Sequence, residues 1–411
     1  MPLIFHIDVN SAFLSWSAIE RLKKDPSLDI RTIPSIIGGD EKSRHGIVLA
    51  KSIPAKKFGI QTAEPVAAAL RKCPFLHIEP PAHGLYRRRS RELIELLSSY
   101  TSDIEQVSID ECYLDFTPIA HRFASPETAA RTIADRIRDE LGFTVNVGIA
   151  PNKLLAKMAS DFEKPDRVHT LYIEEIPQKM WPLPVGDLFM VGKSSASRLI
   201  DLGIRTIGDL AHTDRAFLQQ HFKSHGQMMW EYANGIDDSP VHPEDQEAKG
   251  IGNSTTLAAD ITAANDAKLV LLQLAEHVAE RLRHAHQLAS TVTVELKYNT
   301  FRSCSRQTQL DHPVSTSQVL YHCACRLFDE LWNGTPIRLI GLRTTKLLPE
   351  NTPVQLSLFD PEFHLEEEKS QPAPDPEKQR RLEAAMDQIR QRYGNNAVMR
   401  GSLFNFTKTK S

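Results

Sequence analysis

The 411-residue chain lacks the features of a membrane or secreted protein. No apolar run approaches the ~20 residues that a membrane helix needs. The N-terminus has no basic region followed by an apolar signal core, so we expect a cytoplasmic protein without membrane contact. Its five cysteines form no paired framework, which is typical of reduced thiols. The His322-Cys323-Ala324-Cys325 segment has no second ligand pair at a suitable distance, so no zinc site is expected.

The chain also lacks an excess of positive charge, because its formal net charge is −3. A uniformly basic nucleic-acid binder is therefore excluded, but the charges are unevenly distributed. Residues 281–346 hold nine lysines and arginines against four acids, whereas residues 350–368 hold six acids and no lysine or arginine. A basic module followed by an acidic tail is compatible with DNA binding by one part of the chain.

The composition is that of a globular protein, 41% hydrophobic and 25% charged. The length predicts about two to four structural units. Strand and helix patterns alternate up to about residue 168, whereas residues 172–240 are patterned as helices with short loops. Within the first region, Leu141–Ile149 predicts a strand, and Asn152 predicts the N-cap of a helix that runs through Asp161. After a polar linker, strand and helix patterns return at about 250–348. The predicted fold class is therefore α/β with α+β character.

Three carboxylates stand at the ends of predicted strands. Asp8 follows the apolar run Leu3–Ile7, and Asp110 and Glu111 lie between two alternating segments that predict a hairpin with the acidic pair at its turn. Carboxylates that converge on one rim suit Mg²⁺, and two such ions can clamp the attacking and leaving oxygens of a phosphoryl transfer. The alternative is that these acids pair with surface lysines or arginines.

A second motif lies in the helical region. Gly192 and Lys193 precede a predicted helix, and Gly203 separates that helix from the next. Helix N-termini and glycine turns let backbone N–H groups approach a phosphate oxygen, as in a helix-hairpin-helix that contacts the DNA backbone. An ordinary helical hairpin capped by glycine is the alternative.

Three segments of the chain carry a more specific signal: Ile7–Phe13, Ser108–Asp115 and Gly148–Asp161. Together they resemble the Y-family DNA polymerases, most closely the DinB-like translesion branch, and their order and spacing fit over residues 1 to about 346. The Ser-Ile-Asp-Glu element of the second segment is highly specific. The resemblance implies a right-hand polymerase with a palm, small fingers, a helical helix-hairpin-helix thumb and a separate α/β little finger.

The resemblance also implies domain boundaries. They are palm at 1–10 and 80–171, fingers at 11–79, thumb at 172–240, linker at 241–249, little finger at 250–348, and a flexible tail at 349–411.

By the same resemblance, Asp8, Asp110 and Glu111 hold two Mg²⁺ ions. The backbone carbonyl of Val9 also coordinates metal. One ion activates the primer 3′-hydroxyl, and the other binds the triphosphate and stabilises the departing pyrophosphate. Lys164 matches the family's triphosphate lysine.

Phe13 follows five residues after Asp8 and matches the steric gate, whose ring excludes a 2′-hydroxyl. A plain core aromatic is the alternative. Lys56 lies in the fingers motif, where the family commonly has Arg, and Ile53 stands where it commonly has Tyr. Lysine neutralises a phosphate but lacks the bidentate fork of Arg. Asn10 stands where many relatives have Asp, so we do not count it as a ligand.

The second α/β unit, with its alternating strand Thr291–Tyr298, resembles the little finger that grips the duplex backbone. Its polar stretch Asn299–Gln309 carries Arg302 and Arg306, and phosphate contact needs only positive charge and donors. With Gly192 and Lys193 of the thumb, these arginines are the expected DNA-binding residues. A solvated charged face is the alternative.

The tail carries two further signals. The first resembles the peptide by which bacterial replication proteins bind the sliding clamp, with a stray apolar patch as the alternative; its residues are Gln355, Leu356, Ser357, Leu358 and Phe359. The second is a predicted helix that docks either on its own protein or on a partner; one face of it carries Leu382, Met386, Ile389 and Tyr393.

These features predict a template-directed DNA polymerase for translesion synthesis, with low fidelity and no proofreading. We expect a monomer whose partners are primer-template DNA, deoxynucleoside triphosphates and the bacterial sliding clamp. One alternative is the catalytic subunit of a mutagenesis complex that needs accessory proteins. Another is a DNA- and clamp-binding scaffold whose catalysis has decayed, which Ile53 and Lys56 suggest. Loss of a metal carboxylate would favour the scaffold, and all three are present.

Overall fold

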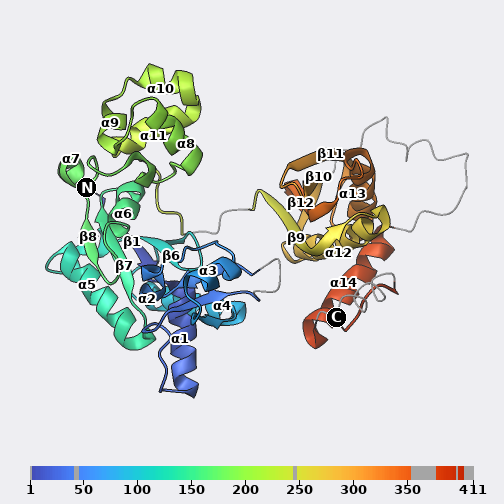
Figure 1. Cartoon of the computed structure of the whole chain (residues 1–411), viewed down its shortest axis with the longest axis horizontal. Helices are drawn as coiled ribbons and strands as arrows, with labels where there is room; N and C mark the ends of the chain where they lie inside the picture. Colours follow the sequence, from blue (N-terminus) through green and yellow to red (C-terminus); the bar gives the residue numbers. More distant parts are fainter. Residues whose placement is uncertain (1, 41–45, 244–247, 353–375, 395–396, 402–411) are drawn as a thin grey trace, which may run out of the picture. The chain divides into compact units, whose positions relative to one another are not determined.

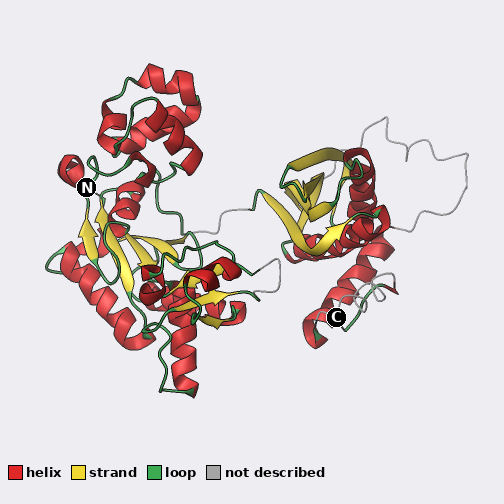
Figure 2. Ribbon diagram, viewed as in Figure 1, coloured by secondary structure: helices red, strands yellow, loops and turns green. Residues whose placement is uncertain are grey.

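The computed structural model describes residues 2–40, 46–243, 248–352, 376–394 and 397–401. The chain divides into two compact units, Met1–Asp245 and Gln246–Ser411 (Figures 1 and 2). Within the ranges given above, none of the helices combines the length and the apolar character that a membrane crossing requires.

A five-stranded sheet forms the centre of the first unit, in the order β5-β6-β1-β7-β8. Its strands are β1 (Ile4–Val9), β5 (Ile104–Gln106), β6 (Glu111–Asp115), β7 (Val145–Ala150) and β8 (Val168–Thr170). β1 pairs antiparallel with both β6 and β7. Because side chains alternate along a strand, Phe5 and Ile7 of β1 face one side of the sheet, and His6 and Asp8 face the other.

Helices cover both faces of this sheet. Phe5 and Ile7 share a core with α1 (Ala12–Lys24), α4 (His83–Ser98) and α5 (Pro126–Arg136). α1 therefore packs with the five-stranded sheet, although it falls inside the range expected for the fingers.

The opposite face packs against α6 (Lys153–Ser160). Asn152 caps this helix as predicted, because its side chain accepts the Leu155 N–H at 2.9 Å. The preceding strand β7 begins at Val145 and not at Leu141, because Leu141 ends a π-helical turn and Gly142 follows it in the left-handed conformation at φ +80°.

A smaller three-stranded sheet, in the order β3-β2-β4, has its own core. It consists of β2 (Ser35–Gly38), β3 (Val48–Lys51) and β4 (His77–Glu79), with helices α2 (Ile53–Lys57) and α3 (Val66–Lys72). Ser52 starts α2 by accepting the Ala55 N–H at 3.1 Å.

The helical region expected after residue 172 is confirmed. It contains α7 (Ile176–Lys179), α8 (Lys193–Asp201), α9 (Ile207–His212), α10 (Arg215–Phe222) and α11 (Ser224–Ala233). Gly192 is the N-cap of α8, and the turn from α8 to α9 passes through Gly203 at φ +87°, a conformation that favours glycine. The predicted pair of helices joined by a glycine turn is thus present.

The second unit contains a four-stranded antiparallel sheet in the order β11-β10-β12-β9. The strands are β9 (Gly250–Ile261), β10 (Gln287–Tyr298), β11 (Ser303–Val314) and β12 (Ile337–Pro349). Helices α12 (Ala264–His284) and α13 (Ser317–Leu331) share the apolar core with one face of the sheet. The polar stretch that follows β10 is a turn and the first part of β11.

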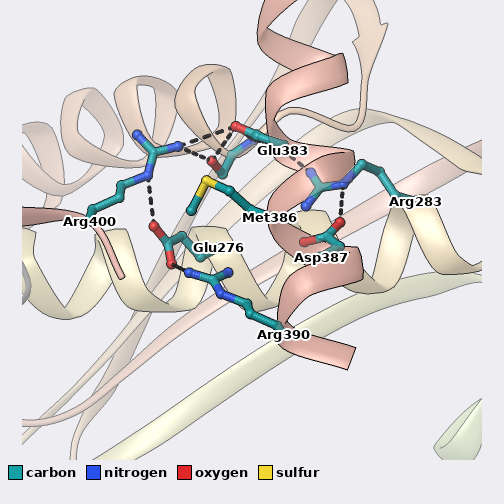
Figure 3. Close-up of a pocket in the computed structure, with 8 residues that line it drawn as sticks. Glu276, Arg283, Glu383, Met386, Asp387, Arg390 and Arg400 are labelled. Atoms are coloured by element: carbon teal, nitrogen blue, oxygen red, sulfur yellow. Dashed lines mark hydrogen bonds and ion pairs between the residues drawn. The ribbon is translucent and has the colours of Figure 1, made fainter. Parts of the chain in front are cut away.

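The predicted C-terminal helix is α14 (Pro376–Tyr393), and it packs on α12 through buried ion pairs (Figure 3). Arg283 of α12 donates to Asp387 at 2.7 Å, and Arg390 donates to Glu276 of α12 at 2.9 Å. All four side chains are nearly inaccessible, so each charge is neutralised by a partner when the helices meet.

Of the four apolar residues predicted on one face of α14, only Met386 lies in this contact, where it lines a pocket among the ion pairs (Figure 3). Leu382, Ile389 and Tyr393 are 57%, 40% and 68% exposed. Of the two alternatives for this helix, docking on its own unit is observed, but charged residues together with Met386 make the contact.

Candidate active site

The sheet brings the three predicted carboxylates to one edge. Asp8 and Glu111 are direct cross-strand neighbours in the β1–β6 pairing. Asp110 is the last residue of the β5–β6 connection, and its carbonyl accepts the Val9 N–H at 3.1 Å. The predicted hairpin with the acidic pair at its turn is therefore confirmed.

Two lysines lie among these carboxylates. Lys157 Nζ, from α6, is 3.1 Å from Glu111 Oε1 and 3.5 Å from Asp8 Oδ2. Lys164 Nζ is 2.6 Å from Asp8 Oδ2. Asp161 contacts both ammonium groups, at 3.3 Å and 2.8 Å. Sequence reasoning assigned no role to Lys157, although its position four residues before Asp161 on one helix was a usable signal.

In the part of the chain that the structure describes, no group of three or more His, Cys, Asp or Glu side chains is arranged to hold a metal ion. The ammonium groups of Lys157 and Lys164 supply the positive charge at the carboxylates instead.

The electrostatics of the site nevertheless fit a divalent cation. Burial raises the pKa of Asp110, and the negative charges of Asp8 and Glu111 raise it further, against a hydrogen bond from Ser108. The three acids thus lie within electrostatic reach of one another. They offer hard oxygen donors beside a cavity, which is the donor set that Mg²⁺ prefers.

Glu111 is held in its charged form by two neighbours. Its pKa is lowered to about 2, chiefly by His6 and also by Lys157, while burial opposes the shift. His6 is fully buried; its Nδ1 hydrogen-bonds Ser160 at 2.8 Å, and its Nε2 lies 3.6 Å from Glu111 Oε2. Burial lowers the pKa of this histidine itself. The sequence marked His6 only as a residue of the first strand.

A cavity of about 670 Å³ adjoins the carboxylates. Asp8, Asp110 and Lys164 line it from the five-stranded sheet and the loops beside it, and Lys51 and Lys56 line it from the small sheet and α2. The predicted phosphate-binding lysines, Lys56 and Lys164, thus share one cavity with two of the carboxylates.

Lys51 is a further cation in this cavity, which sequence reasoning missed. Burial lowers its pKa, and the nearby charge of Lys56 lowers it further. Its ammonium donates to the Thr62 hydroxyl at 3.3 Å. Ile53 also lines the cavity and is 58% exposed. Because its side chain is a hydrocarbon, it offers the cavity no hydrogen bond.

Phe13 lies in the first turn of α1 and lines the same cavity. Its ring stacks on Tyr86 with centroids 4.6 Å apart, and the Tyr86 hydroxyl bonds Ser17 at 3.0 Å. The ring is therefore supported from behind while one side borders the cavity. Both the gate and the core-aromatic interpretations are compatible with this position.

Asn10 is fully engaged within the fold. Its amide donates to Asn146 at 3.1 Å, and its oxygen accepts from Thr144 at 3.0 Å and from the Asp166 N–H at 2.9 Å. These bonds hold the Asn10 side chain against β7 and the loop that follows Lys164.

The expected DNA-binding residues of the second unit differ in their surroundings. Arg306 pairs across strands with buried Val294, so it points toward the helices, where its Nε lies 2.6 Å from Glu330. Arg302 is exposed in the turn before β11. Arg343 of β12 is also exposed, and it is paired across strands with Thr293.

Family models match three segments of the chain. Residues 7–161 match the impB/mucB/samB family, and residues 248–358 match the C-terminal domain of that family. Residues 186–237 match the thumb domain of DNA polymerase-iota.

Relatives cover nearly the whole chain. DNA polymerase IV of Clostridium acetobutylicum is 47% identical over 401 residues, which is 98% of this chain and 98% of that protein. DNA polymerase IV 1 of Bacillus subtilis is 36% identical over 411 residues, 100% of this chain and 95% of that protein. A solved Y-family polymerase chimera of Dbh and Dpo4 matches the fold with a TM-score of 0.72 at 21% identity, over 84% of this chain and 99% of that chain.

The chain therefore belongs to the Y family of DNA polymerases. It is a DNA-directed DNA polymerase of translesion synthesis, which acts on primer-template DNA and nucleotides and depends on a divalent metal. The resemblance seen in the sequence is confirmed. The segment Gln355–Phe359, which the sequence predicts to bind the sliding clamp, lies outside the described residues.

Proposed function

We propose that Asp8, Asp110 and Glu111, with the backbone carbonyl of Val9, form a site for two Mg²⁺ ions at which the primer is extended. Such ions lower the pKa of the primer 3′-hydroxyl and stabilise the departing pyrophosphate. The cross-strand pairing of Asp8 with Glu111 beside the cavity carries this proposal, because it places the carboxylates next to space for a nucleotide.

Lys164 acts on the triphosphate in this proposal. Its ammonium borders the cavity and contacts Asp8, so it would be within reach of the phosphate oxygens of a nucleotide bound there. Lys56 and Lys51 also line the cavity and neutralise phosphate charge there. Lysine carries a compact charge and cannot make the bidentate contact of Arg with a phosphate. In this proposal several lysines therefore neutralise the phosphates where the family commonly uses one arginine.

Phe13 closes the sugar end of the nucleotide site. Its ring rests on Tyr86, which resists displacement by a larger sugar. A 2′-hydroxyl would then meet the ring, so deoxynucleotides are selected over ribonucleotides.

Contacts to the DNA backbone come from both units. Gly192 and Lys193 start α8, where free N–H groups favour an anion. In the second unit, exposed Arg302 is better suited than Arg306, whose charge is already paired with Glu330. Arg343 joins this set as an exposed cation on the sheet. These contacts bind the DNA backbone without sequence specificity.

In this proposal each polymerase domain corresponds to one sheet or one helical region of the structure. The five-stranded sheet with α1, α4, α5 and α6 is the palm, and the three-stranded sheet with α2 and α3 is the fingers. Helices α7–α11 are the thumb, and residues 250–348 are the little finger. We place the chain as a monomer in the bacterial cytoplasm, where chromosomal DNA lies, with residues 355–359 as its contact to the sliding clamp.

Primer extension by the purified full-length chain tests the catalytic proposal. We expect extension by deoxynucleotides with Mg²⁺, loss of extension in excess EDTA, and recovery when Mg²⁺ is restored. DNA binding without extension would favour the scaffold alternative. Extension only after a cell extract is added would favour the accessory-dependent complex.

A further inference from the structure

Two phenylalanines of the fingers lie outside the apolar core of their small sheet. Phe58 is 40% exposed and Phe75 is 68% exposed. Their rings meet edge to face, with centroids 5.5 Å apart and planes at 85°. A pair of exposed aromatic rings on so small a unit marks an interaction surface more often than a single exposed side chain does.

The position of this pair is determined by a contact between two helix ends. Phe58 directly follows α2, and Phe75 lies three residues after the end of α3. Lys72, the last residue of α3, donates to the Gly59 carbonyl at 2.8 Å and to Glu64 at 2.5 Å. These bonds tie the α2 and α3 ends together, so the two rings form a fixed pair.

The surroundings of the rings are positively charged. Residues 51–75 contain five lysines and arginines and one acid, Glu64, which is paired with Lys72. Lys57 and Arg71 are exposed, and neither has an ion-pair partner among the described residues. The surface therefore suits a partner that combines negative charge with flat apolar groups.

We infer that Phe58 and Phe75 form a stacking platform for unpaired bases of the template strand ahead of the nucleotide site. Single-stranded DNA supplies both required features, because its bases have open π-faces and its phosphates are anionic. Duplex DNA fits less well, since its bases already stack on one another.

The location of α2 supports this partner. Ile53 and Lys56 of α2 line the nucleotide cavity, and Phe58 follows Lys56 by two residues. Template bases that have not yet reached the cavity would thus meet the rings beside the end of α2. The inference rests on the proposed polymerase function, which supplies the single-stranded template.

Binding of full-length protein to two labelled primer-templates tests the platform. One has a 5′ template overhang of about ten nucleotides and the other an overhang of one. We expect the longer overhang to strengthen wild-type binding at least about fivefold, and the double variant Phe58→Ala/Phe75→Ala to lose this gain. Phe217→Ala, which removes a 36%-exposed ring from the thumb, is the matched control and should keep it.

Extension on the one-nucleotide overhang separates failure of the platform from failure of the polymerase. A double variant that extends this substrate at the wild-type rate is folded and active. If it has also lost the stronger binding to the longer overhang, that loss results from removal of the two rings. If wild-type protein shows no overhang gain, or the double variant keeps it, the inference is wrong.

Photocrosslinking identifies the contact directly. With 5-iodouracil placed at successive overhang positions, we expect crosslinks to Phe75 or Phe58 in wild-type protein. Crosslinks confined to other residues would overturn the inference and leave the rings as a docking site for an acidic protein.

Discussion

Lys164 Nζ lies 2.6 Å from Asp8 Oδ2, so a carboxylate proposed to bind metal is paired with a cation of the chain itself. Burial alone would lower the pKa of Lys164, but Asp8 and Asp161 outweigh burial and raise it. The lysine thus stays charged next to Asp8. This pairing lets the active site fold without a metal ion, because the buried negative charge has a partner.

The carboxylates at the β1–β6 edge should be essential for chemistry and dispensable for DNA binding. We expect Asp110→Asn and Glu111→Gln each to lower the primer-extension rate by at least about a hundredfold, because each removes a proposed metal ligand. Affinity for primer-template should change less than about twofold, since the DNA grip comes from other residues. Asp115→Asn, at the far end of β6, is the control. Retention of more than a few per cent of the rate by both variants would contradict the metal assignment.

Glu111 should contribute pH-dependent stability to the metal-free protein. Its folded pKa is about 2, below the usual 4.5. A carboxyl group whose pKa is lower in the folded than in the unfolded protein stabilises the fold at pH values above its unfolded pKa. This stabilisation is lost as the pH falls toward the folded pKa. In EDTA, the unfolding free energy of wild type should therefore exceed that of Glu111→Gln at pH 7, and the excess should shrink between about pH 4.5 and 2. An excess that is independent of pH would mean that His6 and Lys157 do not stabilise the charged carboxylate.

Phe13 should control the choice of sugar. We expect Phe13→Ala to raise ribonucleotide incorporation relative to deoxynucleotide incorporation by about tenfold or more, because a 2′-hydroxyl gains room beside Tyr86. Competing rates on one template measure the ratio. Phe116→Ala, which removes a fully buried ring of the same core, is the control for loss of packing. An unchanged ratio in Phe13→Ala would assign Phe13 to the core alone.

Lys51 should contribute to nucleotide affinity. We expect Lys51→Ala to raise the KM for deoxynucleotides by roughly tenfold, with a smaller change in kcat, since it removes a charged donor from the cavity wall. Lys24→Ala, an exposed lysine at the end of α1, should leave both constants unchanged. If both lysine variants behave alike, Lys51 does not contact the triphosphate.

Removal of Gln355–Phe359 should abolish stimulation by a loaded sliding clamp and leave extension without the clamp intact. Tethering raises the effective concentration of a weakly gripping polymerase at its primer, so the clamp should chiefly lengthen products. Product lengths with and without clamp are the measurement. A deletion that lowers activity equally in both conditions would show that the segment packs on its own protein.

Local patterns of the sequence predicted several elements correctly. The alternation around Asp110 predicted the β5–β6 hairpin, and Asn152 predicted the start of α6. The glycines at 192 and 203 predicted the α8–α9 pair. These features depend on neighbouring residues, because strand periodicity and helix caps are set within a few positions along the chain.

Other features depend on contacts between distant elements, and only the tertiary structure decided them. Lys157 reaches Asp8 across 149 positions, and Arg306 meets Glu330 because the β10–β11 register turns it toward the helices. The α14 helix was predictable from its pattern, but its docking face was not, since that face depends on the charges of α12. The sequence by itself thus determined the family, the elements and the acidic triad, whereas register and packing decided which charges neutralise one another.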